Sequence, residues 1–339
     1  MKKKPIVITM GEPSGVASEI LLKTWLLRRK KKLPPFFAID SLKKLNHINN
    51  LFDLKVKFKL IEKPLDSNFF FADFLPVLDI KENFSFKLGK PNPSNGKIVI
   101  NSIVKSFKFI NSGEARAMVT LPVCKKTLKV SGFKFSGQTE FLSDLSEKIY
   151  KKKHDEIMIL TTNKPVDNGK NLIVGLVTTH VPLKSIFKNI SKNGLISKIF
   201  AFNNSLQTIW GINQPKIALA SINPHSGEGG LIGEEEKKII VPVIEKLNYE
   251  GLKLFGPLSS DSCFFKTIRK KYDGILCLYH DQGLAPIKIL DFYNSVNVTG
   301  NLPILRVSPD HGPAFDIAKK NIAKTDSLVA SIKFLEKFC

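Results

Sequence analysis

Short apolar runs alternate with amphipathic stretches along most of the chain. Apolar runs bounded by turn residues indicate buried strands, and apolar residues spaced three and four apart indicate helices. The predicted strands cover 5–10, 115–121, 156–162, 171–180, 216–225 and 273–280. The predicted helices cover 16–27, 141–150, 183–207 with a break near Asn193-Gly194, 234–248 and 326–338. This order predicts an α/β fold with a largely parallel sheet, whereas the Phe-, Pro- and Asn-rich stretch 63–100 allows no assignment.

Three histidines stand at the carboxyl ends of predicted strands: His180, His225 and His280. Ligands of open α/β sheets bind in the crevice outside these ends. Three imidazoles delivered there by separate strands can hold one divalent metal and leave positions open for a substrate. A single histidine in such a place is as readily structural as a ligand, but the position shared by all three favours a metal site.

The stretch 225–236, HSGEGGLIGEEE, is rich in glycine and leads into a predicted helix. Its glycines allow positive φ and a close approach of the backbone. Gly227, Gly229 and Gly233 lack the GxGxxG spacing, so an ordinary dinucleotide-binding loop is rejected here. Farther on, Asp310-His311-Gly312 predicts a turn before another helix, where structural capping and contact with a cofactor remain equally open.

Arg306 lies in a short apolar segment that is predicted to be a strand. An arginine in such a run either forms a structural ion pair or binds a carboxylate or phosphate with two N–H groups of its planar guanidinium. Lys288 and Asn297 are candidates to join Arg306 in binding an anionic substrate.

The chain of 339 residues is long enough for two domains, and its formal net charge is +22. A strongly basic protein can bind nucleic acid or anionic substrates. The lysines are spread along the chain without an aromatic-interleaved RNA-binding signature. We therefore expect a solvated basic surface and no nucleic-acid partner.

Several further features concern the cellular compartment. No stretch of about 18 uninterrupted apolar residues occurs, and the first apolar run is too short for a signal peptide. The cysteines Cys124, Cys263, Cys277 and Cys339 lack the spacing of a zinc site or a disulfide framework. We expect a cytoplasmic enzyme with reduced cysteines and no membrane partner.

Seven motifs together resemble the 4-hydroxythreonine-4-phosphate dehydrogenase family of the vitamin B6 pathway. They are ITMGEPSGVASEI (8–20), SGQTEFL (136–142), TTHVPL (178–183), NPHSGEGGLIGEE (223–235), GPLSSDSCF (256–264), YHDQGLAPIK (279–288) and RVSPDHGPAFDIA (306–318). Each motif is short, but their order and spacing cover nearly the whole chain.

The resemblance implies an isocitrate/isopropylmalate-dehydrogenase-like fold of two α/β/α domains with a cleft between them. The first domain is expected over 1–130 and 312–339, and the second over 131–311, with the metal ligands and the dimer interface. The implied assembly is a homodimer whose active site lies at the subunit interface and takes one histidine from the partner. The implied cofactors are NAD or NADP, bound without a GxGxxG loop, and one divalent metal (Zn, Mg or Co).

The resemblance also implies roles for individual residues. His180, His225 and His280 would bind the metal, and the implied substrate contacts are Gln138, Thr139, Lys288, Asn297 and Arg306. The implied reaction oxidises 4-phosphooxy-L-threonine at its C3 hydroxyl, and decarboxylation then gives 3-amino-2-oxopropyl phosphate. A metal would stabilise the developing alkoxide. Asp261 or Asp281 would orient a ligand or accept a proton.

Two departures from the family pattern affect these expectations. Gln138 stands where the family usually has His, and glutamine forms hydrogen bonds but cannot carry a proton. This keeps open a paralogous dehydrogenase of another phosphorylated hydroxy acid, such as 4-phosphoerythronate. A phosphate acyltransferase of similar fold is a further alternative, although it does not need three strand-end histidines. In addition, Asn321 lies in the stretch 318–323, where the family has two glycines; asparagine can take the left-handed C-cap conformation, so we expect altered loop detail and an intact fold.

Overall fold

A computed structural model describes residues 3–163, 165–166 and 171–339. The chain divides into two compact units: unit 1 comprises Met1–Gln138 and Ile304–Cys339, and unit 2 comprises Thr139–Pro303. The sequence-based borders lie at 130/131 and 311/312, whereas the compact units meet at 138/139 and 303/304. Among the described residues, no helix is both long and apolar enough to cross a membrane.

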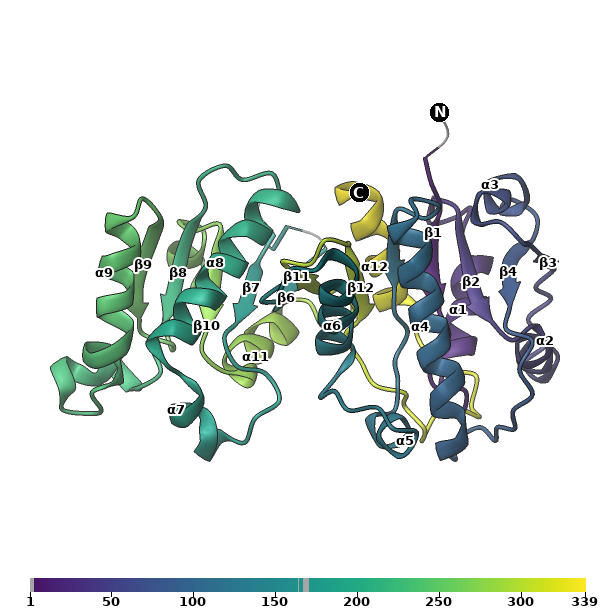
Figure 1. The fold of residues 1–339 in the computed structure, drawn as a ribbon, viewed down its shortest axis with the longest axis horizontal. Helices are drawn as coiled ribbons and strands as arrows, with labels where there is room; N and C mark the ends of the chain where they lie inside the picture. The colour runs from purple at the N-terminus through teal and green to yellow at the C-terminus, as the bar shows by residue number, and fades with distance from the viewer. Residues whose placement is uncertain (1–2, 164, 167–170) are drawn as a thin grey trace. The chain divides into compact units, whose positions relative to one another are not determined.

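Unit 1 contains a parallel sheet with the strand order β3-β4-β2-β1-β5-β12. Its strands are β1 (Ile6–Thr9), β2 (Phe36–Asp40), β3 (Phe58–Leu60), β4 (Leu75–Asp79), β5 (Ala117–Val119) and β12 (Arg306–Pro309). Its helices are α1 (Ala17–Leu26), α2 (Leu42–Leu51), α3 (Ser67–Phe70), α4 (Gly96–Asn111), α5 (Lys125–Val130) and α12 (Asp326–Phe338), with short 3-10 turns η1 (Pro64–Asp66) and η2 (Pro93–Asn95). Figure 1 shows α4 in front of this sheet and α1 behind it, so helices cover both faces.

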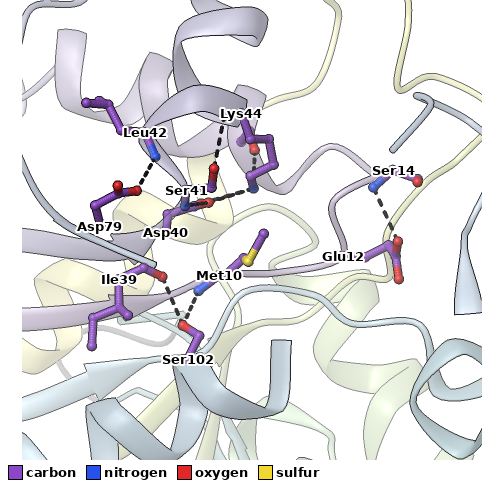
Figure 2. A network of polar contacts seen from close by, with 11 residues as sticks. Met10, Glu12, Ser14, Ile39, Asp40, Ser41, Leu42, Lys44, Asp79 and Ser102 are labelled. Atoms are coloured by element: carbon purple, nitrogen blue, oxygen red, sulfur yellow. Dashed lines mark hydrogen bonds and ion pairs between the residues drawn. The ribbon is translucent and has the colours of Figure 1, made fainter. Parts of the chain in front are cut away.

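A buried polar network connects the ends of β1 and β2 with α2, as Figure 2 shows. Nζ of Lys44 lies 3.0 Å from the carboxylate of Asp40, and each residue is only 1% exposed. The hydroxyl of Ser102 accepts a hydrogen bond from the Met10 N–H at 2.8 Å and donates to the Ile39 carbonyl at 2.9 Å. Buried polar groups in folded proteins almost always have a hydrogen-bond partner. These contacts therefore fix the loops that follow both strands.

Unit 2 contains a mixed sheet with the strand order β11-β6-β7-β10-β8-β9. Its strands are β6 (Ile157–Thr161), β7 (Ile173–Leu176), β8 (Lys216–Ala220), β9 (Lys253–Leu258), β10 (Gly274–Cys277) and β11 (Val296–Gly300). Strands β7, β10, β8 and β9 run parallel, and β6 runs antiparallel to β7 and β11. The carboxyl ends of the four parallel strands therefore lie at one edge of this sheet.

The helical elements of unit 2 precede or connect its strands. They are α6 (Gln138–Tyr150), which begins one residue before the border, η3 (Leu183–Ser185), α7 (Ile186–Asn189), α8 (Lys192–Thr208), η4 (Pro224–Gly230), the π turn η5 (Glu236–Ile240), α9 (Val241–Tyr249), α10 (Lys266–Arg269) and α11 (His280–Leu290). Helix α8 contacts β6, β10 and β11, and α11 contacts β6, β7 and β10.

Alternate residues of β7 face α8 and α11. A Cβ at Gly175 would lie 2.9 Å from the ring of Phe202 in α8, and a Cβ at Gly283 in α11 would lie 2.7 Å from Leu176. Side chains of successive strand residues point to opposite faces, so the two helices cover opposite faces of the sheet. Glycine at position 283 allows α11 to pack closely on β7, and this packing positions the start of α11.

The α/β prediction is confirmed, and each predicted strand is present with shorter bounds. The predicted break in 183–207 lies at Ile190 instead of Asn193-Gly194, because Ser191 caps α8 by accepting from the Gly194 N–H. The helix expected after Asp310-His311-Gly312 is wrong, since 315–321 forms turns and α12 begins only at Asp326. Asn321 has φ +55°, so it does take the left-handed conformation.

Candidate active site

His180 and His280 lie side by side because the strands that precede them are neighbours. Strands β7 and β10 are parallel partners, and their pairing continues beyond the strand ends. The Thr178 N–H and hydroxyl both donate to the Leu278 carbonyl, at 3.2 and 2.7 Å. As a result, the two imidazole ring centroids are 5.6 Å apart, with 42° between the ring planes.

The sequence placed the three histidines at the ends of their strands, and this prediction is wrong in detail because all three lie beyond the last strand residue. Strand β7 ends at Leu176 and β8 at Ala220, so His180 and His225 lie in the loops beyond them. His280 is the first residue of α11, after an extended N-cap residue. An acidic residue in the first turn, Asp281, favours a helix start at this point because it complements the helix dipole. The three histidines nevertheless follow the carboxyl ends of their strands.

The loop that carries His225 has a left-handed backbone. Residues 225–229 all have positive φ, between +42° and +76°, although three of them are not glycine. Glu236, only 4% exposed, holds the start of this loop: its carboxylate accepts from the Ile222 and Asn223 N–H groups, each at 2.8 Å, and from the Asn223 side chain. This anchor compensates for a conformation that side chains other than glycine rarely adopt.

The two predicted carboxylates lie next to different histidines. Oδ1 of Asp281 is 2.7 Å from Nδ1 of His280, the arrangement that leaves Nε2 available as a ligand. Asp261 is exposed, and a hydrogen bond from the Ser259 side chain is the main reason that its pKa lies below the ordinary value. An electrostatic interaction with His225 lowers the pKa of Asp261 further.

The His180–His280 pair fits a shared divalent ion. Two imidazoles on one tetrahedral ion have ring centroids about 5 Å apart, given metal–nitrogen bonds of about 2.1 Å. The observed separation of 5.6 Å is close to that value. Across residues 3–163, 165–166 and 171–339, however, no group of three His, Cys, Asp or Glu side chains is close enough to hold a metal. The pair is thus present within one chain, and the full set of three is not.

Lys288 and Asn297 belong to α11 and β11 of unit 2. Nζ of Lys288 donates to the Ser295 hydroxyl at 3.3 Å and lies 5.1 Å from the ring centroid of Phe292. The side-chain oxygen of Asn297 is buried, and no hydrogen-bond partner for it occurs among the described residues. A buried acceptor without a partner is costly, so it is suited to receive a donor from a ligand.

Arg306 and Gln138 belong to unit 1 and Thr139 belongs to unit 2, and all three lie close in sequence to the borders of the units. Arg306 is 3% exposed and donates from Nε and Nη2 to the Thr120 hydroxyl at 2.9 and 2.6 Å. Nε2 of Gln138 is 3.5 Å from the Leu121 carbonyl, while its buried Oε1 has no partner in the described part of the chain. Thr139, half-buried, is the second residue of α6. Arg306 and Gln138 therefore both contact the segment that follows β5.

Several residues that hold the histidine loops in place could not be recognised from the sequence. Glu236 anchors the loop before His225, and Gln282, Ser260 and Thr178 form hydrogen bonds between neighbouring loops. Buried polar residues next to strand-end histidines are the one signal that could have pointed to them, because such residues need partners.

An imidazole pair and a carboxylate at the carboxyl ends of parallel strands, with the ammonium of Lys288 in α11 and the buried amide oxygen of Asn297 in β11, define an α/β enzyme. The chain belongs to the family of the pyridoxal phosphate biosynthetic protein PdxA, whose family model matches residues 33–335.

Individual members of the family are similar over their whole length. A 4-hydroxythreonine-4-phosphate dehydrogenase of Caulobacter vibrioides is 37% identical over 338 residues, covering 99% of this chain and 98% of that protein. The crystal structure of a 4-hydroxythreonine-4-phosphate dehydrogenase from Klebsiella pneumoniae matches with a TM-score of 0.84 at 30% identity, covering 99% of both chains. A terephthalate 1,2-cis-dihydrodiol dehydrogenase from Burkholderia xenovorans matches with a TM-score of 0.61 at 21% identity, covering 98% of this chain and 97% of that one, which shows the fold alone. The predicted family and fold class are confirmed.

Proposed function

We propose that this protein is a metal-dependent 4-hydroxythreonine-4-phosphate dehydrogenase that oxidises 4-phosphooxy-L-threonine at C3 and transfers the hydride to NAD or NADP. The full-length similarity to dehydrogenases of that name supports the reaction. Within this chain, the pairing of His180 and His280 at neighbouring strand ends is the observation that carries the proposal. The oxidised product is a β-keto acid, which loses CO2 to give 3-amino-2-oxopropyl phosphate.

A divalent ion (Zn, Mg or Co) held by His180, His225 and His280 would supply a Lewis acid for the developing alkoxide. Asp281 would orient His280 through Nδ1, which leaves Nε2 of the ring to bind the ion. Asp261 has a lowered pKa and is therefore ionised at neutral pH, where it stabilises positive charge near His225. We assign positioning roles to both carboxylates.

The charged and amide side chains would bind the substrate's polar groups. Lys288 and Arg306 supply cations for the phosphate and carboxylate of the substrate, and the arginine adds a planar fork. The side-chain oxygens of Asn297 and Gln138, which have no partner among the described residues, are acceptors for its ammonium or hydroxyl donors. Thr139, next to Gln138, adds a hydroxyl.

A homodimer with the active site at the subunit interface forms part of the proposal. Exposed apolar side chains follow the site residues in several loops of unit 2: Leu183, Leu231, Phe265, Ile289 and Phe292 are between 62% and 87% exposed. Large apolar side chains with this exposure are candidates for a subunit contact surface. A partner that covers them would also bring a third histidine to the pair. An NAD(P)-dependent biosynthetic step is consistent with a cytoplasmic location.

Formation of reduced nicotinamide from 4-phosphooxy-L-threonine tests the proposed function. Turnover is expected to need an added divalent metal and to be lost in His280→Ala, whereas His47→Ala in α2 of unit 1 serves as a matched control with full activity. A parallel assay with 4-phosphoerythronate tests the alternative substrate that Gln138 leaves open. If the folded, metal-loaded wild type turns over only the second compound, the substrate assignment is wrong. If it turns over neither, the proposed function fails.

A further inference from the structure

Gln282 uses its whole side-chain amide to connect three loops of unit 2. It lies in the first turn of α11, two residues after His280, and is 7% exposed. Its Oε1 accepts from the Leu278 N–H at 2.7 Å, and its Nε2 donates to the Ser221 carbonyl at 2.6 Å and to the Ser260 hydroxyl at 2.8 Å. These partners follow β10, β8 and β9.

Ser260 closes the connection between two of these loops. Its hydroxyl accepts from Gln282 and donates to the Ser221 carbonyl at 2.8 Å. Ser221 begins the loop that carries His225, and Ser260 directly precedes Asp261. The loops after β8 and β9 are thus joined both to each other and to α11.

The loop after β7 joins the same chain of hydrogen bonds through Leu278. The N–H of Leu278 donates to Gln282, while its carbonyl accepts from Thr178, two residues before His180. The sequence Thr178–Leu278–Gln282–Ser221–Ser260 therefore follows the strand order β7-β10-β8-β9 across the sheet edge. Each segment that bears a histidine or Asp261 contributes at least one member.

The residue type at position 282 follows from this arrangement. The site offers one backbone donor, one backbone acceptor and one hydroxyl, and a primary amide satisfies all of them at once because it is both acceptor and double donor. An apolar residue of similar length would leave the Leu278 N–H and the Ser221 carbonyl buried without this partner, and the loops would lose their common connection.

We infer that Gln282 is a positioning residue that sets the placement of the loops carrying His180, His225 and His280 within each subunit, and thereby the affinity of the assembled protein for a divalent cation. The inference rests on the proposed function, since it assumes that these histidines bind the metal. Residues that orient metal ligands without touching the metal typically change metal affinity by about 10- to 100-fold when replaced.

The test is a Co²⁺ titration of the full-length protein, followed by the visible absorption of the bound ion and paired with denaturant unfolding. Gln282→Met keeps the length of the side chain and removes its hydrogen bonds. Ser260→Ala removes a single member of the network and is the milder second variant. Asn248→Ala is the matched control, because the Asn248 amide brackets Leu254 with the same two kinds of hydrogen bond, at 2.8 and 3.0 Å, at the opposite end of β9.

Gln282→Met is expected to weaken Co²⁺ binding by about 10- to 100-fold and to alter the absorption spectrum of the bound ion. Ser260→Ala is expected to show a smaller loss in the same direction, and it decides the matter if Gln282→Met does not fold. Asn248→Ala should unfold at lower denaturant but bind Co²⁺ like the wild type.

Wild-type Co²⁺ affinity and spectrum in both network variants, with lower stability alone, would overturn the inference and leave the proposed function standing. A wild type that binds no Co²⁺ and oxidises no 4-phosphooxy-L-threonine overturns the proposed function and the inference with it. The two failures are therefore distinguished by the wild-type protein.

Discussion

Arg306 directs two N–H groups, Nε and Nη2, at the single hydroxyl oxygen of Thr120, 2.9 and 2.6 Å away. Strand β12 carries Arg306 and pairs in parallel with β5, and Thr120 is the residue that directly follows β5. A hydroxyl oxygen has two lone pairs and can accept both hydrogen bonds. Strand pairing and Thr120 together fix the orientation of this buried cation.

Arg306→Lys keeps the charge but removes the planar fork. We expect the KM for 4-phosphooxy-L-threonine to rise roughly 10- to 100-fold, the cost of losing a hydrogen bond to a charged group. Steady-state kinetics check this, with the KM for the nicotinamide cofactor as the internal control. An unchanged substrate KM in the folded variant would remove Arg306 from the substrate site.

Asp281→Ala removes the carboxylate that lies 2.7 Å from Nδ1 of His280. Because Asp281 is 77% exposed, the free energy of unfolding should change by less than about 0.5 kcal/mol. Metal affinity, in contrast, should fall about 10-fold or more, since the orientation of the ligand ring is lost. Co²⁺ titration and denaturant unfolding of the same sample separate the two effects. Equal affinity in variant and wild type would show that Asp281 does not orient His280.

Glu12→Gln tests a buried carboxyl in unit 1, which Figure 2 shows next to the Ser14 N–H that donates to it at 3.2 Å. Burial raises the pKa of Glu12 above its ordinary value of 4.5 and outweighs the hydrogen bonds from Ser14 and Thr127. The folded state therefore holds this proton more tightly than the unfolded chain does. The resulting stability is present below the ordinary pKa and is lost as the pH rises through the raised pKa.

Glutamine cannot ionise, so Glu12→Gln should lack this loss. We expect the variant to gain stability relative to the wild type as the pH increases from about 4.5 towards neutrality. Denaturant unfolding at a series of pH values measures the difference. A difference that is constant with pH would show that Glu12 titrates alike in both states.

The cysteine thiols should differ in reactivity. Burial raises the pKa of Cys263 to about 12 and also raises the pKa of the fully buried Cys277. Since the thiolate is the reactive form, iodoacetamide at about pH 8 should leave both unmodified in the native protein. The half-buried Cys124 and the exposed Cys339 should react instead, although desolvation raises the pKa of the Cys339 thiol. Peptide mapping reads out each site, and labelling in guanidinium gives the fully reactive control; rapid native labelling of Cys263 would contradict the burial.

The sequence predicted the strands that carry the site because their apolar runs are continuous. Strands β7, β8 and β10 are buried on both faces by helices, so almost every residue in them is apolar. β4 was missed because Pro76 interrupts its pattern, although this residue is tolerated in the pairing with Lys59 of β3.

The geometry of the site could not be predicted in the same way. The start of α11 at His280, the left-handed run 225–229 and the connections of Gln282 depend on contacts between residues far apart in the sequence. Hydrophobic periodicity contains no information on such contacts, because it reports only which face of an element is buried. The motif order could identify the family, and the structure was needed to show what holds the motifs together.

The discontinuity of unit 1 also determines the order in which the protein can fold during synthesis. Strand β5 emerges from the ribosome early, but its neighbour β12 follows only after residues 120–305 have been made. At translation rates of about 5 to 20 residues per second, this interval lasts roughly 10 to 40 s. All of unit 2 is synthesised during this interval, and the edge of β5 that pairs with β12 remains unpaired until the interval ends. An unpaired strand edge invites association with other chains, so the nascent protein is most vulnerable to aggregation during this interval.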